Sequence, residues 1–165
     1  MSKVQVNVVN TSENPLPKYS TKGSAGVDLR ASFTNGNLKE EYLNFAAWDE
    51  EGGYLILFSG GSALIPTDLF VDIPEGYEIQ IRPRSGLALK HKITVLNTPG
   101  TIDSDYRGNI GIILINLGED PFIINEGDRV CQAVLSKVDQ IDWNQVTSLE
   151  KTDRGAGGFG HTGKD

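Results

Sequence analysis

Residues 63–83, ALIPTDLFVDIPEGYEIQIRP, contain two strand-like runs separated by a turn. The runs extend from Ala63 to Ile73 and from Glu78 to Pro83. Between them, Pro74-Glu75-Gly76 carries the two residue types that most often interrupt regular structure. Short apolar runs bounded by such residues are typical of β-strands. This stretch therefore predicts a β-domain.

The same pattern continues in both directions along the chain. Val4, Val6 and Val8 alternate with polar residues, which is the period of a half-buried strand. Nineteen glycines and seven prolines leave little room for helix, and only Leu87 to Lys92 is compatible with a turn or two. We expect one all-β domain over residues 1–165, built as a sandwich, jelly roll or barrel. The other strand-like runs are Val27 to Ala31, Tyr54 to Phe58, Ile93 to Leu96, Ile110 to Asn116, Phe122 to Asn125 and Val130 to Val138.

Two segments depart from this pattern. Residues 32–62 are polar and contain an acidic cluster followed by Gly52-Gly53, so we expect a surface hairpin or loop insertion there. Residues 152–165 are rich in glycine and have few side chains that could form a core, which predicts a mobile C-terminal arm. This arm still offers a cation, an aromatic ring and polar donors, a mixture suited to closing over a nucleotide. Residues 158–164 also fit the start of a P-loop, but Asp165 stands where Ser or Thr must bind magnesium.

Composition excludes several classes of function. The chain has 22 acidic and 15 basic residues and a net charge of −7, which argues against binding to nucleic acid. No apolar run approaches the roughly 20 residues that span a bilayer, so we expect no membrane partner. Cys131 is the only cysteine, and no charged-then-apolar leader precedes Val4. These features predict a reducing, cytoplasmic location, which would be the host cytoplasm for a viral protein.

Two segments contain groups that could act on a phosphate ester. Residues 82–88 place a cation, a hydroxyl and a glycine at the end of a predicted strand, which suits an oxyanion or phosphate, although the same residues are common in turns. Residues 97–108 place Asp103, Asp105 and Tyr106 on a predicted tight hairpin. The two carboxylates could share a metal, act as a base with a structural partner, or simply be solvated.

Taken together, five segments resemble the five ordered motifs of the trimeric all-β dUTPase family. They occur in the family's order, and the resemblance covers nearly the whole chain. Connecting phrases such as Ile65-Pro66-Thr67 are also similar. The five segments are Ala25 to Ala31, Pro83 to Ala88, Gly100 to Gly108, Gly127 to Gln132 and Arg154 to Gly163.

The resemblance implies a dUTPase-like β-barrel or jelly roll with a flexible C-terminal arm. It also implies a homotrimer whose active sites are shared between subunits, and Mg²⁺-dependent hydrolysis of dUTP to dUMP and pyrophosphate. Two alternatives remain open. One is a relative of the dCTP deaminases, which share this fold. The other is a regulatory protein that binds nucleotide and contacts its partner through the 32–62 insertion.

The resemblance also implies a role for individual residues. Asp103 matches the aspartate that activates the attacking water, and Tyr106 matches the aromatic residue that packs on the deoxyribose. Asp28 matches an aspartate near magnesium and its waters, with simple pairing to an arginine as the alternative. Arg129 is expected to form a buried ion pair. His161 stands where serine is common, and either substitutes for it or adds a dependence on pH. The remaining substrate-binding matches are Asn97 and Gly100 at uracil, Arg84, Ser85, Gly86 and Gln132 at phosphates, and Arg154, Phe159, Gly160 and Thr162 in the arm.

Overall fold

The computed structural model describes residues 3–49 and 53–158 and confirms the all-β expectation. Within the described residues, no helix is long and apolar enough to cross a membrane. The strands are β1 (Asn7–Asn10), β2 (Val27–Arg30), β3 (Leu43–Asp49), β4 (Tyr54–Pro66), β5 (Leu69–Asp72), β6 (Tyr77–Arg82), β7 (Ile93–Val95), β8 (Gly100–Ile102), β9 (Gly111–Asn116), β10 (Phe122–Asn125) and β11 (Arg129–Lys137), and the helices are η1 (Glu40–Tyr42) and α1 (Ser85–His91).

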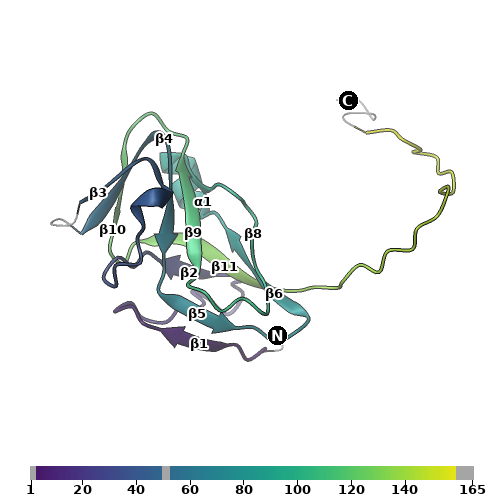
Figure 1. Ribbon diagram of the computed structural model, residues 1–165, viewed down its shortest axis with the longest axis horizontal. Coiled ribbons are helices and arrows are strands. Elements are labelled where there is room, and N and C mark those ends of the chain that lie inside the picture. The colour runs from purple at the N-terminus through teal and green to yellow at the C-terminus, as the bar shows by residue number, and fades with distance from the viewer. Residues whose placement is uncertain (1–2, 50–52, 159–165) are drawn as a thin grey trace.

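The strands form antiparallel sheets that pack into one body (Figure 1). One sheet has the order β2-β11-β6-β8, and a second has the order β10-β4-β9-β7 with β3 added on β4. β1 and β5 pair separately. Neighbours in the sheets are often distant in sequence, since β4 pairs with both β9 and β10. Long-range pairing of this kind fixes the loops at the ends of the strands relative to one another.

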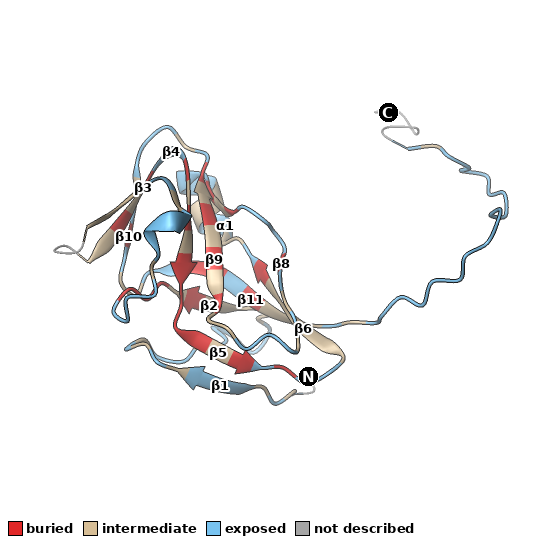
Figure 2. Cartoon of the chain, viewed as in Figure 1, coloured by how far each residue is buried: buried red, intermediate tan, exposed pale blue. Residues whose placement is uncertain are grey.

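The core is built from side chains that alternate along the central strands. In β9, Ile112, Leu114 and Asn116 are buried, whereas the residues between them are only partly covered (Figure 2). A period of two is what a strand with one face on the core requires. Asn116 is tolerated inside because its amide donates to the carbonyls of Leu57 and Asp120.

Residues 32–62, expected to be a surface insertion, instead contribute to the core. β3 and β4 do pair as a hairpin, and Gly53 has the positive φ of 64° expected of a turn glycine. However, β4 is continuous over thirteen residues, and its Leu55 and Leu57 are fully buried. Each leucine contributes about 1.5–3 kcal/mol of hydrophobic stabilisation by this burial. The strand-like run Tyr54 to Phe58 is therefore part of a core strand that pairs with β10, and not of a surface loop.

A bulge in this hairpin has a strict requirement for glycine. Between the pairs Asn44 with Ser62 and Ala46 with Leu57, the register of β3 against β4 shifts, and Phe45 adopts a φ of 46°. A Cβ at Gly61 would lie 2.1 Å from the carbonyl oxygen of Phe45, which is closer than any real contact. Gly61 therefore permits the close approach of the two backbones at this bulge.

The C-terminal segment leaves the body of the domain after β11 (Figure 1). From 139 to 158 it forms neither strand nor helix, and its large apolar side chains are exposed. Trp143 is 83% exposed and Leu149 is 86% exposed. An extended segment with large apolar groups in solvent is suited to docking on another surface.

Candidate active site

Four residues predicted to bind or attack the substrate lie around one cavity. β8 pairs with β6 and places Gly100 opposite Ile81, shortly after the turn that contains Asn97. The cavity has a volume of about 250 Å³ and is lined by Asn97, Gly100, Asp103 and Tyr106 together with apolar residues of β6, β7 and β9. A side chain on Gly100 would meet Asn97 and Ile81 at 3.3 Å, so glycine keeps this pocket open.

Asp103 and Asp105 belong to a turn and not to an extended strand. The backbone N–H of Tyr106 donates to the carbonyl of Asp103 at 3.2 Å, which closes the turn. Both aspartates are exposed. Arg107 fixes the turn from outside, since its guanidinium donates to the carbonyl of Ser104 and to the Asp72 carboxylate, both at 2.6 Å. The Asp103 carboxylate is thus presented to solvent from a braced loop.

Tyr106 is held over a glycine. Its hydroxyl donates to the carbonyl of Asn109 at 2.9 Å, and its ring covers the Cα of Gly108. A Cβ at Gly108 would lie 2.3 Å from that hydroxyl oxygen. Arg107, Gly108 and Asn109 therefore shape the loop, although the sequence had assigned no role to any of them. Their position directly after Tyr106, at the end of the motif, is the signal that could have identified them.

The residues predicted to contact phosphate gather at a second place. Ser85 and Gly86 are the first residues of α1, and a Cβ at Gly86 would meet nothing within 4 Å, so its backbone is open to a ligand. Gln132 on β11 lies opposite Arg82 of β6 and Asp28 of β2. The Arg84 guanidinium donates to the carbonyl of Arg129 at 2.8 Å. Pairing of β2, β11 and β6 thus assembles this cluster.

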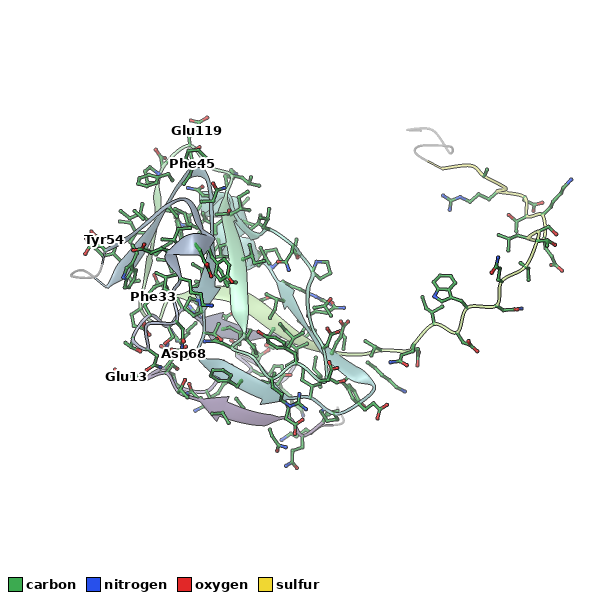
Figure 3. All side chains as sticks on the ribbon, in the orientation of Figure 1. Glu13, Phe33, Phe45, Tyr54, Asp68 and Glu119 are labelled. Atoms are coloured by element: carbon green, nitrogen blue, oxygen red, sulfur yellow. The ribbon has the colours of Figure 1, made fainter. Side chains whose placement is uncertain are left out.

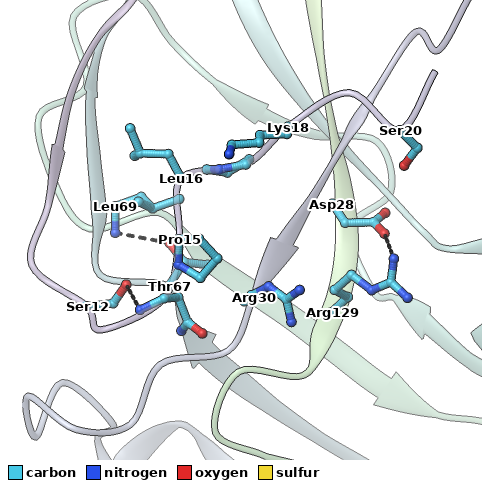
Figure 4. A pocket seen from close by; sticks show the side chains of 12 residues that line it. Ser12, Pro15, Leu16, Lys18, Ser20, Asp28, Arg30, Thr67, Leu69 and Arg129 are labelled. Atoms are coloured by element: carbon cyan, nitrogen blue, oxygen red, sulfur yellow. Dashed lines mark hydrogen bonds and ion pairs between the residues drawn. The ribbon is translucent and has the colours of Figure 1, made fainter. Parts of the chain in front are cut away.

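Asp28 is paired with two arginines. Its carboxylate lies 3.4 Å from Arg84 and 3.1 Å from Arg129, and Figure 4 shows the second pair beside Lys18 and Arg30 in a pocket of about 230 Å³. The Arg129 side chain is 49% exposed, so the expectation of a buried ion pair is wrong, because only Asp28 is largely covered. Exposed pairs contribute little to stability.

These contacts fit magnesium only in an indirect way. The described residues contain no group of three or more His, Cys, Asp or Glu side chains that could hold a metal ion. The Asp28 carboxylate is already balanced by two guanidiniums. It can accept hydrogen bonds from the water shell of an ion carried by a triphosphate, which is how Mg²⁺ commonly binds.

The remaining predicted residues belong to the C-terminal arm. Arg154 is exposed, and its guanidinium donates to the carbonyl of Gly157 at 2.9 Å within the arm itself. Phe159, Gly160, His161 and Thr162 lie outside the described residues. The described part of the arm, up to Gly158, lies away from the cavity beside Asp103 and from the cluster at α1 within this single chain (Figure 1).

Comparison with known proteins identifies the family. The dUTPase family model matches residues 53–163. Deoxyuridine 5'-triphosphate nucleotidohydrolase of Fusobacterium nucleatum is 50% identical over 164 residues, 99% of this chain and 100% of the relative. The enzyme of the same name from Finegoldia magna is 49% identical over 160 residues, 97% of this chain and 99% of the relative. The structure of Staphylococcus bacteriophage 80alpha dUTPase with dUPNHPP covers 98% of this chain and 99% of its own, with a TM-score of 0.79 and 24% identity. This chain belongs to the dUTPase family.

Proposed function

We propose that this protein hydrolyses dUTP to dUMP and pyrophosphate, with Asp103 activating the attacking water. The predicted hairpin over residues 97–108 is not formed, because β8 pairs with β6 and not with a strand next to it in sequence. The observation that carries this proposal is the cavity at β8, which Asn97, Gly100, Asp103 and Tyr106 line. Membership of the dUTPase family supports the same activity. The cavity beside Asp103 supports both the proposed hydrolysis and the proposed selection of uracil.

The cavity beside Asp103 would hold uracil. It is lined by apolar side chains and by the polar groups of Asn97, Asp103 and Asn109, and the absence of a side chain at Gly100 leaves space beside Asn97 and Ile81. Such a pocket excludes the methyl group of thymine by size. Cytosine would present a donor where uracil presents an acceptor, and each stranded polar group would cost about 1–3 kcal/mol. The Tyr106 ring, fixed over Gly108, would pack on the deoxyribose and leave no room for a 2′-hydroxyl.

Asp103 is placed to act as a general base. Its carboxylate is exposed on a turn closed by Tyr106 and braced by Arg107. A positioned carboxylate that accepts a hydrogen bond from water can take the proton as oxygen attacks the α-phosphorus. The proton passes to Asp103, the new bond joins water oxygen to phosphorus, and the bond to the pyrophosphate oxygen breaks.

The second cluster would bind the triphosphate. Arg84, Ser85 and Gly86 supply a cation, a hydroxyl and open backbone, and Gln132 adds an amide. Hydrogen bonds and charge at the leaving oxygens stabilise the transition state. In the arm, Arg154 would contact the γ-phosphate, Phe159 would stack on uracil, and Gly160, His161 and Thr162 would complete the phosphate contacts. Mg²⁺ would enter with the triphosphate and offset its charge, with Asp28 contacting the waters of the ion.

The active site would be completed by subunits of a homotrimer. The cavity beside Asp103 is lined by residues between Leu64 and Ile113, whereas Arg84 lines a different hollow with Leu87 and Phe122. The exposed arm supports the same view, since Trp143 and Leu149 lack cover in one chain. A neighbouring subunit would bring the phosphate cluster and the arm to each cavity.

A cytoplasmic location is consistent with the thiol. Cys131 is buried, and burial raises its pKa to about 12, so it is kept in the unreactive protonated form. A structure of this kind makes no use of a disulfide. We expect no nucleic-acid or membrane partner, because the net charge of −7 repels phosphate backbones and anionic lipid.

Pyrophosphate release from dUTP, dTTP, dCTP and UTP tests the proposal. The wild type should prefer dUTP, and Asp103→Asn should lower kcat by about 10²–10⁴, the range for loss of a general base. Asp105→Asn is the matched control, since that aspartate is also exposed on the same turn, and should stay within a few-fold. Equal activity of Asp103→Asn and wild type would exclude Asp103 as the general base. Ammonia release from dCTP would instead support a deaminase.

A further inference from the structure

Asp68 is a fully buried carboxylate in the connection between β4 and β5 (Figure 3). Two neutral groups donate to its Oδ2, the hydroxyl of Ser32 at 2.8 Å and the amide of Asn35 at 2.9 Å. Two more donate to its Oδ1, the amides of Asn37 at 2.5 Å and Asn109 at 2.7 Å. The carboxylate is therefore surrounded by amides and a hydroxyl.

Four hydrogen bonds keep this group charged inside the protein. Burial by itself raises the pKa of the Asp68 carboxyl, but the hydrogen bonds from Asn37, Ser32, Asn35 and Asn109 together lower it below the ordinary value. The backbone of Asp68 is also unusual, with a φ of 54° in the left-handed region. Such a conformation persists only where surrounding contacts determine it. The network thus fixes both the side chain and the main chain at this point.

Asn109 joins this network to the loop that presents Tyr106. Its side-chain Nδ2 donates to Asp68, and its Oδ1 accepts from the backbone N–H groups of Asp68 at 3.0 Å and of Thr67 at 3.3 Å. Its own carbonyl accepts from the Tyr106 hydroxyl at 2.9 Å. The N–H of Tyr106 in turn donates to the carbonyl of Asp103. A continuous chain of hydrogen bonds therefore runs from the buried carboxylate to the catalytic loop.

We propose that Asp68, acting through Asn109, is a positioning residue that sets the place of Tyr106 and thereby the preference for deoxyribose over ribose. The inference rests on the proposed function, because it assigns Tyr106 to the sugar. The physical reason is geometric. A ring that excludes a 2′-hydroxyl must be held to within a fraction of an ångström, and Tyr106 is itself 43% exposed.

Isosteric exchanges test the link without changing side-chain size. Asp68→Asn turns one acceptor oxygen into a donor, and Asn109→Asp sets a second carboxylate oxygen against Oδ1 of Asp68. Each single exchange should lower the dUTP-to-UTP ratio of kcat/KM about tenfold, because small misplacements at a site have large effects. The double variant restores one amide-to-carboxylate bond between residues 68 and 109, so its ratio should return to within about threefold of the wild type.

Asn37→Ala is the matched control. Asn37 donates to the same Oδ1 as Asn109 but has no bond to the Tyr106 loop. It should leave the substrate ratio within about twofold even where it lowers stability. Tyr106→Phe removes only the hydrogen bond from the Tyr106 hydroxyl to the Asn109 carbonyl, and the side chain is exposed, so the variant should fold. It should lower the dUTP-to-UTP ratio of kcat/KM, as the single exchanges do.

Hydrogen exchange of the amides from 104 to 109 separates this inference from the proposed function. The amides should exchange faster in Asp68→Asn and Asn109→Asp than in Asn37→Ala, whatever the substrate is. Faster exchange with an unchanged dUTP-to-UTP ratio would overturn the positioning role, and so would equal effects of Asn37→Ala and Asn109→Asp. A wild type that releases no pyrophosphate from dUTP would instead refute the proposed function.

Discussion

Alanine at residue 108 would displace Tyr106 without touching the core. A Cβ there would lie 2.3 Å from the hydroxyl oxygen and 2.5 Å from Cζ of Tyr106, so either the Tyr106 ring or the backbone at residue 108 must move. Because the ring is 43% exposed, it can turn into solvent and leave the sheets undisturbed. The change would also break the bond from the Tyr106 hydroxyl to the carbonyl of Asn109.

The stability effect of Gly108→Ala should be small and the effect on activity large. The lost hydrogen bond contributes about 1 kcal/mol, and an alanine offsets part of that by restricting the unfolded chain by about 0.4–1 kcal/mol. The melting temperature should therefore change by no more than about 2–4 °C. A ring displaced by an ångström or more from the sugar should lower kcat/KM for dUTP by about 10²-fold.

Initial rates of pyrophosphate release and thermal unfolding measure the two effects on the same samples. Gly23→Ala is the control for a glycine-to-alanine change, because a Cβ at Gly23 would meet nothing within 4 Å. It should leave both quantities near the wild-type values. If Gly108→Ala hydrolyses dUTP as well as Gly23→Ala does, the place of the Tyr106 ring has no part in catalysis and the reasoning fails.

Three further predictions concern the body of the domain. Leu55→Ala should lower the free energy of unfolding in urea by about 2–5 kcal/mol, and Phe58→Ala by much less, since Leu55 is fully buried and Phe58 is 42% exposed. The Asp68 carboxyl has a lowered pKa, so its stabilisation is present above the unfolded pKa of about 3.9 and is lost as pH falls. Asp68→Asn should therefore lose less stability than wild type on acidification below about pH 4. Cys131, with a pKa raised to about 12, should resist iodoacetamide in the native protein and react after unfolding.

The local sequence pattern predicted the position of an element where turn residues flank a short apolar run. β10 spans Phe122–Asn125, the same residues as the expected run, because Pro121 precedes it and Gly127 follows it closely. α1 covers Ser85–His91, near the expected Leu87 to Lys92, and ends where Lys92 adopts the left-handed conformation of a helix cap. In both places the residues that stop an element are visible in the sequence itself.

The local sequence pattern did not predict which residues are buried where a strand pairs with a distant part of the chain. Tyr54 to Phe58 was predicted as a strand-like run but placed within a surface insertion, yet its Leu55 and Leu57 are buried in β4, which pairs with β10 more than sixty residues further along the chain. No local periodicity carries that information. The regulatory alternative loses its simplest test for the same reason, since deletion of residues 32–62 would remove core leucines together with any contact surface.

The candidate site divides in the same way. Asn97, Gly100, Asp103 and Tyr106 lie within ten residues, so a motif can identify them together, and the structure places them around one cavity. Asp68 was invisible to this approach. A lone aspartate after a threonine resembles an exposed turn residue, because charged groups are rarely buried. Its partner Asn109 lies 41 residues away, and only the pairing of β4 with β9 brings the two connections together.

The two clusters of site residues place different demands on the chain. The walls of the cavity beside Asp103 come from one chain, because residues of β4, β6, β7, β8 and β9 line it and internal hydrogen bonds brace its loop. In the cluster proposed to bind phosphate, the two guanidiniums already have a partner, since Arg84 and Arg129 both pair with Asp28. A triphosphate would compete with Asp28 for these guanidiniums, and a cation near Asp28 would compensate for that exchange. If the proposed roles hold, the single fold supplies the pocket for the uracil edge, whereas binding of the phosphates would require a rearrangement of charge around Asp28.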